Sequence, residues 1–149
     1  MIDTVAPEVR SRIMAAIKGK DTKPEVAIRR GLHALRFRYR LHGTDLPGKP
    51  DMVFPKYRAV IQINGCFWHG HDCGAARIPQ SRLEYWGPKI GRTQARDAAA
   101  VAAIDAMGWR GLTIWECAMR GKGSPGPEWA VETAARWLAD GGQTSQVRG

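Results

Sequence analysis

The sequence lacks any apolar run that approaches the ~18 residues needed for a membrane-spanning helix. Its opening residues, MIDTVAPEVRSR, also lack the apolar core of a signal peptide. We therefore expect a cytoplasmic protein that makes no contact with membranes. The 149 residues are the usual length of one domain, so we expect a single domain over residues 1–149.

Cysteine is scarce, with three residues in the whole chain. An odd number of thiols in a reducing compartment favours free thiols or metal ligands over disulfides. Cys66 and Cys73 also lack the two-residue spacing of a thioredoxin-like redox pair. These features argue against both a disulfide-stabilised secreted protein and a dithiol oxidoreductase.

Acidic residues are few: 14 Asp and Glu stand against 23 Lys and Arg, which gives a net charge of +9 and an isoelectric point near 10.0. The excess concentrates between residues 10 and 40, where ten basic and two acidic residues give +8 (10 − 2). Such a run can be no more than a solvated helix face. The imbalance over the whole chain nevertheless predicts a polyanionic partner, nucleic acid being the first to test.

Hydrophobic periodicity and turn residues predict an α/β domain with a central mixed sheet flanked by helices. The expected elements are a short helix before residue 19, helices over about 24–35, 93–107 and 128–139, a hairpin formed by MVFPKY and RAVIQI, and a strand over 109–116. Residues 75–91 show weak periodicity and are expected to be irregular. Residues 141–149 are polar and are expected to form a flexible tail. Four tryptophans are assigned to the core: Trp109, Trp115, Trp129 and Trp137.

The stretch INGCFWHGHDC holds two cysteines and two histidines within eight residues: Cys66, His69, His71 and Cys73. Cys117 ends a predicted strand that can lie beside the strand ending at Ile63. Thiolate and imidazole groups are the ligands that Zn²⁺ prefers, and a structural zinc site uses four of them. Spacing alone leaves two sets open, one with His71 and one with His69. The alternative is that Cys66 and Cys117 are small buried apolar residues.

A second candidate for metal binding is Asp51, which ends the turn-rich loop HGTDLPGKPD and begins the first hairpin strand. The hairpin places it across from the polar end of the second strand, with His69 just beyond. Carboxylates and water molecules are the usual ligands of Mg²⁺, and histidine can accept or relay a proton near neutral pH. This pattern favours a metal-binding role for Asp51 over a purely structural role in a turn.

Four motifs together resemble the very short patch repair (Vsr) endonucleases: LPGKPDMVF, INGCFWHGHDC, SRLEYW followed by KIGR, and GWRGLTIWEC. The resemblance extends from about residue 12 to residue 120. It implies a restriction-endonuclease-like fold, one structural zinc ion, and magnesium-dependent nicking of duplex DNA 5′ of the T in a T:G mismatch. Such mismatches arise by deamination of 5-methylcytosine, and the nick initiates very short patch repair. A monomer is expected, associated with the bacterial nucleoid and with other mismatch-repair proteins as further partners.

The resemblance also assigns roles within the active site. Asp51 corresponds to the magnesium-binding aspartate, with the carbonyl of Ile63 as a second contact to the ion. Glu25 corresponds to an acidic active-site position and His69 to the catalytic histidine. The zinc ligands then become Cys66, His71, Cys73 and Cys117.

DNA contacts are expected from two parts of the chain. Phe67, Trp68 and Trp86 correspond to aromatic residues that enter the base stack beside the mismatch, where unstacking is least costly. Residues 1–20 are expected to form a DNA-contacting arm that includes Arg12, Lys18 and Lys20.

Asn64 departs from the family pattern, because relatives carry a second active-site histidine at this position. An amide can hydrogen-bond a phosphate or a metal-bound water but cannot transfer a proton at neutral pH. We therefore expect His69 to carry most of the acid and base chemistry. The sequence leaves two alternative functions open: a zinc-stabilised DNA-binding module without catalysis, and a sequence-specific endonuclease that ignores mismatches.

Overall fold

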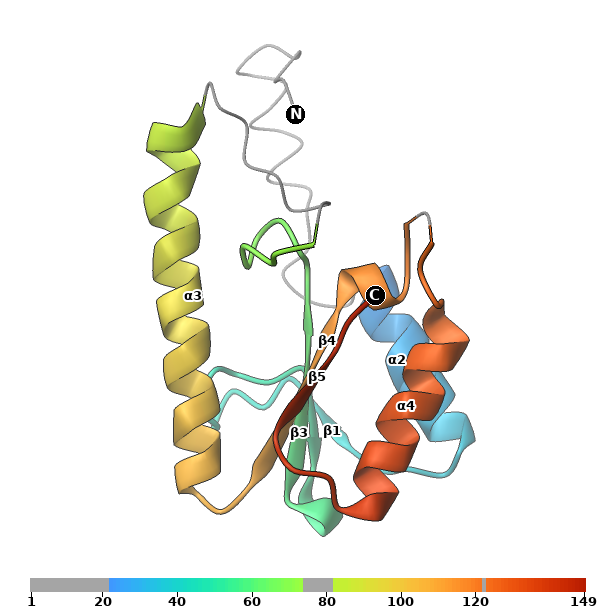
Figure 1. The fold of residues 1–149 in the computed structure, drawn as a ribbon. Coiled ribbons are helices and arrows are strands. Elements are labelled where there is room, and N and C mark those ends of the chain that lie inside the picture. The colour runs from blue at the N-terminus through green and yellow to red at the C-terminus, as the bar shows by residue number, and fades with distance from the viewer. Residues whose placement is uncertain (1–21, 74–81, 122) are drawn as a thin grey trace.

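Five strands form one sheet, in the order β1-β2-β3-β4-β5, among residues 22–73, 82–121 and 123–149, which this computed structural model describes. Figure 1 shows α3 on one face of the sheet and α2 with α4 on the other. The expected α/β class, with a mixed sheet flanked by helices, is confirmed. The expected helix before residue 19 and the DNA-contacting arm, with Arg12, Lys18 and Lys20, lie outside the described residues.

The elements follow one another as α2 (Lys23–Ala34), β1 (Arg40–Leu41), β2 (Met52–Phe54), η1 (Pro55–Tyr57), β3 (Ala59–Asn64), α3 (Leu83–Ala106), β4 (Arg110–Trp115), η4 (Glu116–Ala118), α4 (Pro127–Asp140) and β5 (Ser145–Val147). The α2 helix begins as predicted, since the Thr22 side chain accepts a hydrogen bond from the Glu25 backbone N–H. The predicted hairpin is the antiparallel pair β2 and β3. No helix of the described chain has the length and apolar character needed to cross a membrane.

The two central strands β3 and β4 are parallel, and their register pairs Asn64 with Trp115 at their carboxyl ends. Both strands therefore finish at the same edge of the sheet. Cys66 and Cys117 each follow two residues beyond this last pair. Segments that are 51 residues apart in the sequence (117 − 66) thus meet at one place.

The two faces of the sheet are packed unequally. The face beneath α2 and α4 carries the main core, where Ile28, Leu32 and Leu138 meet Ile61 and Ile114 with almost no exposed surface. The face beneath α3 has a smaller apolar cluster of Val53, Val60 and Ile104. The α3 side therefore has room for a cavity.

The α3 helix begins ten residues earlier than predicted, at Leu83 instead of Thr93 (93 − 83), so the expectation of an irregular segment over residues 83–91 was wrong. Gly87, Pro88 and Gly91 suppress the helical signal, because glycine and proline are the weakest helix formers. Packing overrides this local preference: Ile90 is buried, and it lies against Gly70 of the loop after β3.

The tail after residue 140 also differs from the prediction of a flexible segment, because Ser145–Val147 forms β5 in parallel with β4. Its polar composition concealed the strand, which buries one side chain, Val147. Trp115 and Trp137 are buried and Trp109 is partly buried, as expected. Trp129 was wrongly assigned to the core: it is 38% exposed on α4.

Candidate active site and metal centre

Asp51 lies buried immediately before β2, and its Oδ2 accepts a hydrogen bond from the backbone N–H of Ile63 at 2.7 Å. The ligand atoms of Glu25, His42 and Asp51 lie within 4.8 Å of one another. The loop between β1 and β2 supplies His42 and Asp51 from its two ends, and α2 supplies Glu25. Two buried carboxylates and a partly buried imidazole thus converge in a group that could hold a metal ion.

Burial raises the pKa of the Asp51 carboxyl from 3.8 to about 7, and the negative charge of Glu25 adds to the rise. The hydrogen bond from Ile63 and the charges of His42 and His69 act in the opposite direction. A carboxyl with such a pKa binds a proton readily when no other cation is present. The same geometry would favour a divalent cation, which removes the repulsion between the two carboxylates.

His69 is held by Asp97, whose Oδ2 lies 2.6 Å from the Nδ1 atom of the imidazole. Asp97 comes from α3, which also contacts the same loop through a hydrogen bond from Gln94 Nε2 to the Gly70 carbonyl oxygen. Ile90, Gln94 and Asp97 follow i, i+4 and i+7 spacing, so one face of α3 supports the loop. The helix therefore fixes both the position and the orientation of His69.

Asn64 and His69 both line a cavity of about 500 Å³ between α3 and the sheet. Gln62, Thr93 and Arg96 contribute further polar groups to its wall. Asn64 is 4% exposed, and its Oδ1 atom is buried without a hydrogen-bond partner among the described residues. A buried acceptor of this kind is costly unless a water, an ion or a ligand satisfies it.

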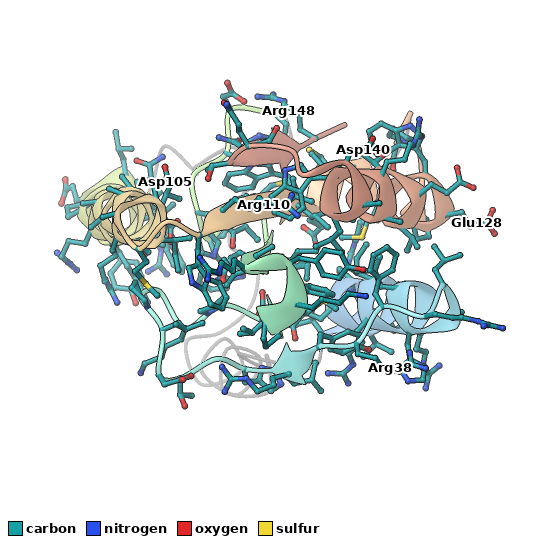
Figure 2. All side chains as sticks on the ribbon, turned by 90° about the horizontal axis from the view of Figure 1, so that it is seen from below. Arg38, Asp105, Arg110, Glu128, Asp140 and Arg148 are labelled. Carbon is teal, nitrogen blue, oxygen red and sulfur yellow. The ribbon has the colours of Figure 1, made fainter. Side chains whose placement is uncertain are left out.

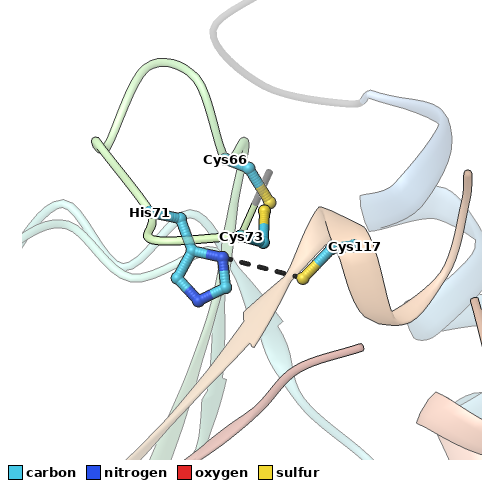
Figure 3. A group of neighbouring side chains, drawn as sticks. All are labelled: Cys66, His71, Cys73 and Cys117. Atoms are coloured by element: carbon cyan, nitrogen blue, oxygen red, sulfur yellow. Dashed lines mark hydrogen bonds between the residues drawn. The ribbon is translucent and has the colours of Figure 1, made fainter. Parts of the chain in front are cut away.

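A separate group of four ligand atoms brings together Cys66, His71, Cys73 and Cys117, all within 4.8 Å of one another (Figure 3). Of the two sets left open by the sequence, the structure assembles the one with His71, while His69 bonds to Asp97 instead. The Cys117 Sγ atom lies 3.6 Å from His71 Nδ1. Sulfur and nitrogen ligands at about 2.3 and 2.0 Å from a tetrahedral zinc ion are separated by about 3.5 Å.

The ionisation of these residues also fits a cation. Burial is the main reason that the pKa of the Cys66 thiol rises to about 12, with the neighbouring Cys73 and Cys117 thiols contributing. Burial lowers the pKa of His71, which favours the neutral imidazole that a metal requires. One buried thiol, two partly buried thiols and one imidazole converge here, and this donor set fits Zn²⁺.

Trp115 connects the two sites. Its indole ring stacks on the His71 imidazole, with centroids 4.0 Å apart and planes 9° apart. The same ring meets His69 edge-on, at 6.3 Å between centroids. A shift of His71 would therefore displace the Trp115 ring, which also contacts His69.

The three aromatic residues assigned to DNA form a group of their own. Phe67, Trp68 and Trp86 are in mutual edge-to-face contact, with centroids 5.1 to 5.5 Å apart. Each is partly exposed, and the core clusters of the described residues do not include them. Tyr85 and Lys89 extend the group on α3, with the Lys89 Nζ atom 5.4 Å from the Trp86 ring centroid. The cluster presents flat apolar surface that packing inside the domain does not use.

The family model described as DNA mismatch endonuclease Vsr matches residues 2–75. DNA mismatch endonuclease Vsr of Escherichia coli K12 is 36% identical over 147 residues, which cover 99% of this chain and 94% of the relative. The chain belongs to the Vsr family. Among other Vsr-like relatives, the type II nicking enzyme V.XorIIP of Xanthomonas oryzae pv. oryzae is 47% identical over 83% of this chain and 91% of its own. The type II nicking enzyme V.NmeAIP of Neisseria meningitidis is 38% identical over 82% and 87%, respectively.

Sequence reasoning missed two residues that the structure adds to these sites, His42 beside Asp51 and Asp97 beside His69. His42 sits in the loop after β1, a strand that the sequence did not predict. Asp97 lies on a helix whose extent and facing side could not be fixed from its weak pattern. Only a helical wheel drawn from residue 83 would have aligned Ile90, Gln94 and Asp97 on one side.

Proposed function

We propose that this Vsr-family protein is a magnesium-dependent endonuclease that nicks duplex DNA 5′ of the T in T:G mismatches left by deamination of 5-methylcytosine. The nick would initiate very short patch repair in the bacterial cytoplasm, at the nucleoid. The observation that carries the proposal is the group formed by the buried carboxylates of Asp51 and Glu25 with the partly buried His42, and with His69 and Asp97 nearby. The names of the relatives support a nicking endonuclease acting on DNA. We also propose a restriction-endonuclease-like fold and a monomeric protein.

Asp51 and Glu25 would hold Mg²⁺, with the Ile63 carbonyl as a further contact. An ion held by these residues would supply charge stabilisation to the scissile phosphate and the leaving oxygen and would make a nearby water more acidic. The Ile63 N–H fixes the Asp51 carboxylate by a 2.7 Å hydrogen bond, so one oxygen is oriented while the other remains available. Asn64 would hydrogen-bond the phosphate or a water through its otherwise unsatisfied Oδ1 or its amide group.

His69 would accept the proton of the attacking water. Asp97 Oδ2 lies 2.6 Å from Nδ1, so Nδ1 would donate its proton to Asp97 and Nε2 would be the atom that accepts the proton of the water. Asp97 is thereby a positioning residue: it selects the tautomer and holds the ring, as carboxylates do for catalytic histidines elsewhere. Asn64 cannot take a proton, so His69 is the single base in this proposal.

Mismatch recognition would come from the aromatic cluster. Phe67, Trp68 and Trp86 would enter the base stack, and Cys66, His71, Cys73 and Cys117 would bind one structural Zn²⁺ that keeps the loop carrying Phe67 and Trp68 rigid. Unstacking a base step costs a few kcal/mol and costs least at a mismatch, so a rigid aromatic wedge selects weakened pairs. The basic arm of residues 1–20, through Arg12, Lys18 and Lys20, would add contacts to phosphates.

The decisive test compares the full chain with Asp51→Asn in a nicking assay and a binding assay on the same T:G duplex in magnesium buffer. Nicking should fall by orders of magnitude because metal binding is lost. DNA affinity should stay the same or increase, because one negative charge near the phosphates is removed. Asp45→Asn, a change at an exposed carboxylate paired with Arg40, is the matched control and should nick normally.

A fully matched duplex of the same sequence separates the remaining alternatives. Equal cleavage of matched and T:G duplexes would indicate a sequence-specific nicking enzyme, in keeping with the type II names of several relatives. Binding without any magnesium-dependent nicking would indicate a DNA-binding module. Near-normal cleavage by Asp51→Asn would show that the proposed active site is wrong.

A further inference from the structure

The residues that follow β5 return to the four-ligand group formed by Cys66, His71, Cys73 and Cys117. Figure 1 shows the C-terminal end of the chain next to the end of β4, where η4 begins. The parallel pairing of β5 with β4 runs as far as Val147 and Ile114, which directs Arg148 and Gly149 toward Cys117. Figure 2 shows Arg148 projecting from this segment, on the side of the molecule away from α2.

Arg148 makes a close ion pair with the residue that follows His71. Its Nη2 atom lies 2.6 Å from Asp72 Oδ1, and the same oxygen lies 3.6 Å from His71 Nε2. His71 Nε2 is buried and has no hydrogen-bond partner among the described residues. If Nδ1 binds a metal, Nε2 must carry the proton of the imidazole and needs an acceptor, which Asp72 is placed to provide.

Gly149 makes a second contact with the group. Its backbone N–H donates a hydrogen bond to the Cys117 Sγ atom at 3.3 Å. A side chain here would not fit, because an added Cβ atom would overlap the carbonyl oxygen of Cys117. An N–H donor directed at a thiolate stabilises its negative charge.

A third contact acts through Trp115, the ring that stacks on His71. The indole Nε1 of Trp115 donates a hydrogen bond to Gln146 Oε1 on β5 at 2.7 Å. The C-terminal residues thus reach His71 from two directions, through Asp72 at the ring edge and through Trp115 at the ring face.

We propose that residues 146–149 close over the metal centre and retain its ion, with Arg148 as a positioning residue that holds Asp72 against the Nε2 edge of His71. The inference rests on the zinc centre proposed above and adds to it the residues that slow release of the ion. Three thiolates and one Zn²⁺ sum to a charge of −1 (−3 + 2). Without Arg148, the Asp72 carboxylate would face that negative centre uncompensated, and it would be repelled from His71.

Loss of Arg148 is expected to affect metal retention more than loss of an ordinary surface ion pair would. Arg148 is 45% exposed and Asp72 is 76% exposed, so their attraction alone would change stability by no more than a few-fold in equilibrium constant. Removing a group that orients a metal-binding histidine has a larger effect, because it typically weakens metal binding by about 10- to 100-fold. The size of the effect on metal retention therefore separates a positioning role from a surface contact.

The experiment measures transfer of zinc from the zinc-loaded full chain to an excess of a chromogenic chelator at a temperature where every variant is folded. Arg148→Ala should release zinc at least about 10-fold faster than the wild-type chain. Arg120→Ala is the matched control, because Arg120 also pairs with a carboxylate, Glu116, one residue before Cys117. It should release zinc at the wild-type rate. Asp72→Asn should accelerate release, and adding it to Arg148→Ala should have little further effect.

Cobalt substitution distinguishes failure of this inference from failure of the metal centre. Co²⁺ bound by thiolates gives an intense charge-transfer absorption that the wild-type chain and both arginine variants should share. A wild-type chain without that absorption overturns both the metal centre and this inference, whereas the nicking proposal is tested separately at Asp51. If cobalt binds as expected but Arg148→Ala releases zinc within about two-fold of the wild-type rate, the metal centre stands and the role of Arg148 is refuted.

Discussion

Burial of Asp51 lowers the stability of the folded chain at neutral pH and also underlies the metal-binding role proposed for this residue. The fold holds its carboxyl beside Glu25 and away from water, and this raises its pKa to about 7. In the unfolded chain the ordinary value is near 3.9. The folded protein therefore binds this proton more tightly, so the stabilising contribution is fully present below about pH 4 and is lost as the pH rises through about 7.

Asp51→Asn should remove this loss, because an amide stays neutral at every pH. In magnesium-free buffer the free energy of unfolding of the variant should exceed that of the wild-type chain by up to about 4 kcal/mol at pH 8, and by less at pH 5. Urea unfolding at several pH values measures the difference. Asp45→Asn should show no such trend, and a variant that is less stable than the wild type at pH 8 would contradict the assignment.

The sequence identified most of the candidate residues at this scale because their side-chain chemistry is distinctive and local. Cys66, His71 and Cys73 lie within eight residues, and Asp51 stands at a strand start after a proline. Asp97 could not be predicted, because the role of an aspartate on a helix depends on what the helix packs against. The same holds for Arg148, whose contacts depend on a strand that the sequence did not predict.

At the scale of elements, one side chain links the start of β4 to the carboxyl end of α4. Arg110, at the start of β4, donates hydrogen bonds from Nη1 to the carbonyl oxygens of Trp137 and Gly142, and from Nη2 to that of Leu138. Its guanidinium also lies 4.3 Å from the Trp137 ring centroid. Helix carboxyl ends have unpaired carbonyl groups and a partial negative charge, and Arg110 satisfies both.

Arg110→Met should therefore destabilise the protein by about 2–4 kcal/mol, since several charge-assisted hydrogen bonds are lost while the apolar stem is kept. Arg136→Met alters an exposed arginine of the same helix and should change stability by less than about 0.5 kcal/mol. Thermal or urea unfolding of the two variants is the measurement. Equal stability of both would show that α4 is held by its apolar face alone.

Element prediction succeeded where local pattern and packing agree, as in α2, the β2–β3 hairpin and β4. It failed in α3, where Gly87, Pro88 and Gly91 weaken the pattern but contacts of Ile90 with the loop stabilise the helix. It failed again in β5, whose three residues have no strand signal of their own and are ordered by pairing with β4. In both cases the stabilising contacts come from distant segments.

At the scale of the whole molecule, the parallel pair β3 and β4 determines where function can lie. Their common end brings Asn64, Cys66 and Cys117 to one edge of the sheet, and α3 adds Asp97 and Trp86 beside it. Phosphate attraction would come from elsewhere, since most of the net charge of +9 lies in residues 10–40, which hold ten basic and two acidic residues. Affinity for DNA and discrimination of a mismatch should therefore respond to different perturbations.

Trp68→Ala should separate these two properties. Stacking of a base on an aromatic ring contributes roughly 1–3 kcal/mol, so the preference for T:G over matched duplex should fall by about 5- to 150-fold. The dependence of affinity on salt should keep its slope, because no charge is altered and the slope reports the number of phosphate contacts. The melting temperature should stay close to that of the wild type, because Trp68 lies outside the core clusters of the described residues.

Trp129→Ala, which removes an exposed indole from α4 on the opposite face of the sheet, should change neither the preference nor the slope. A Trp68→Ala protein that melts much lower yet still prefers T:G duplex as strongly would place the indole in the folding core and remove it from mismatch recognition.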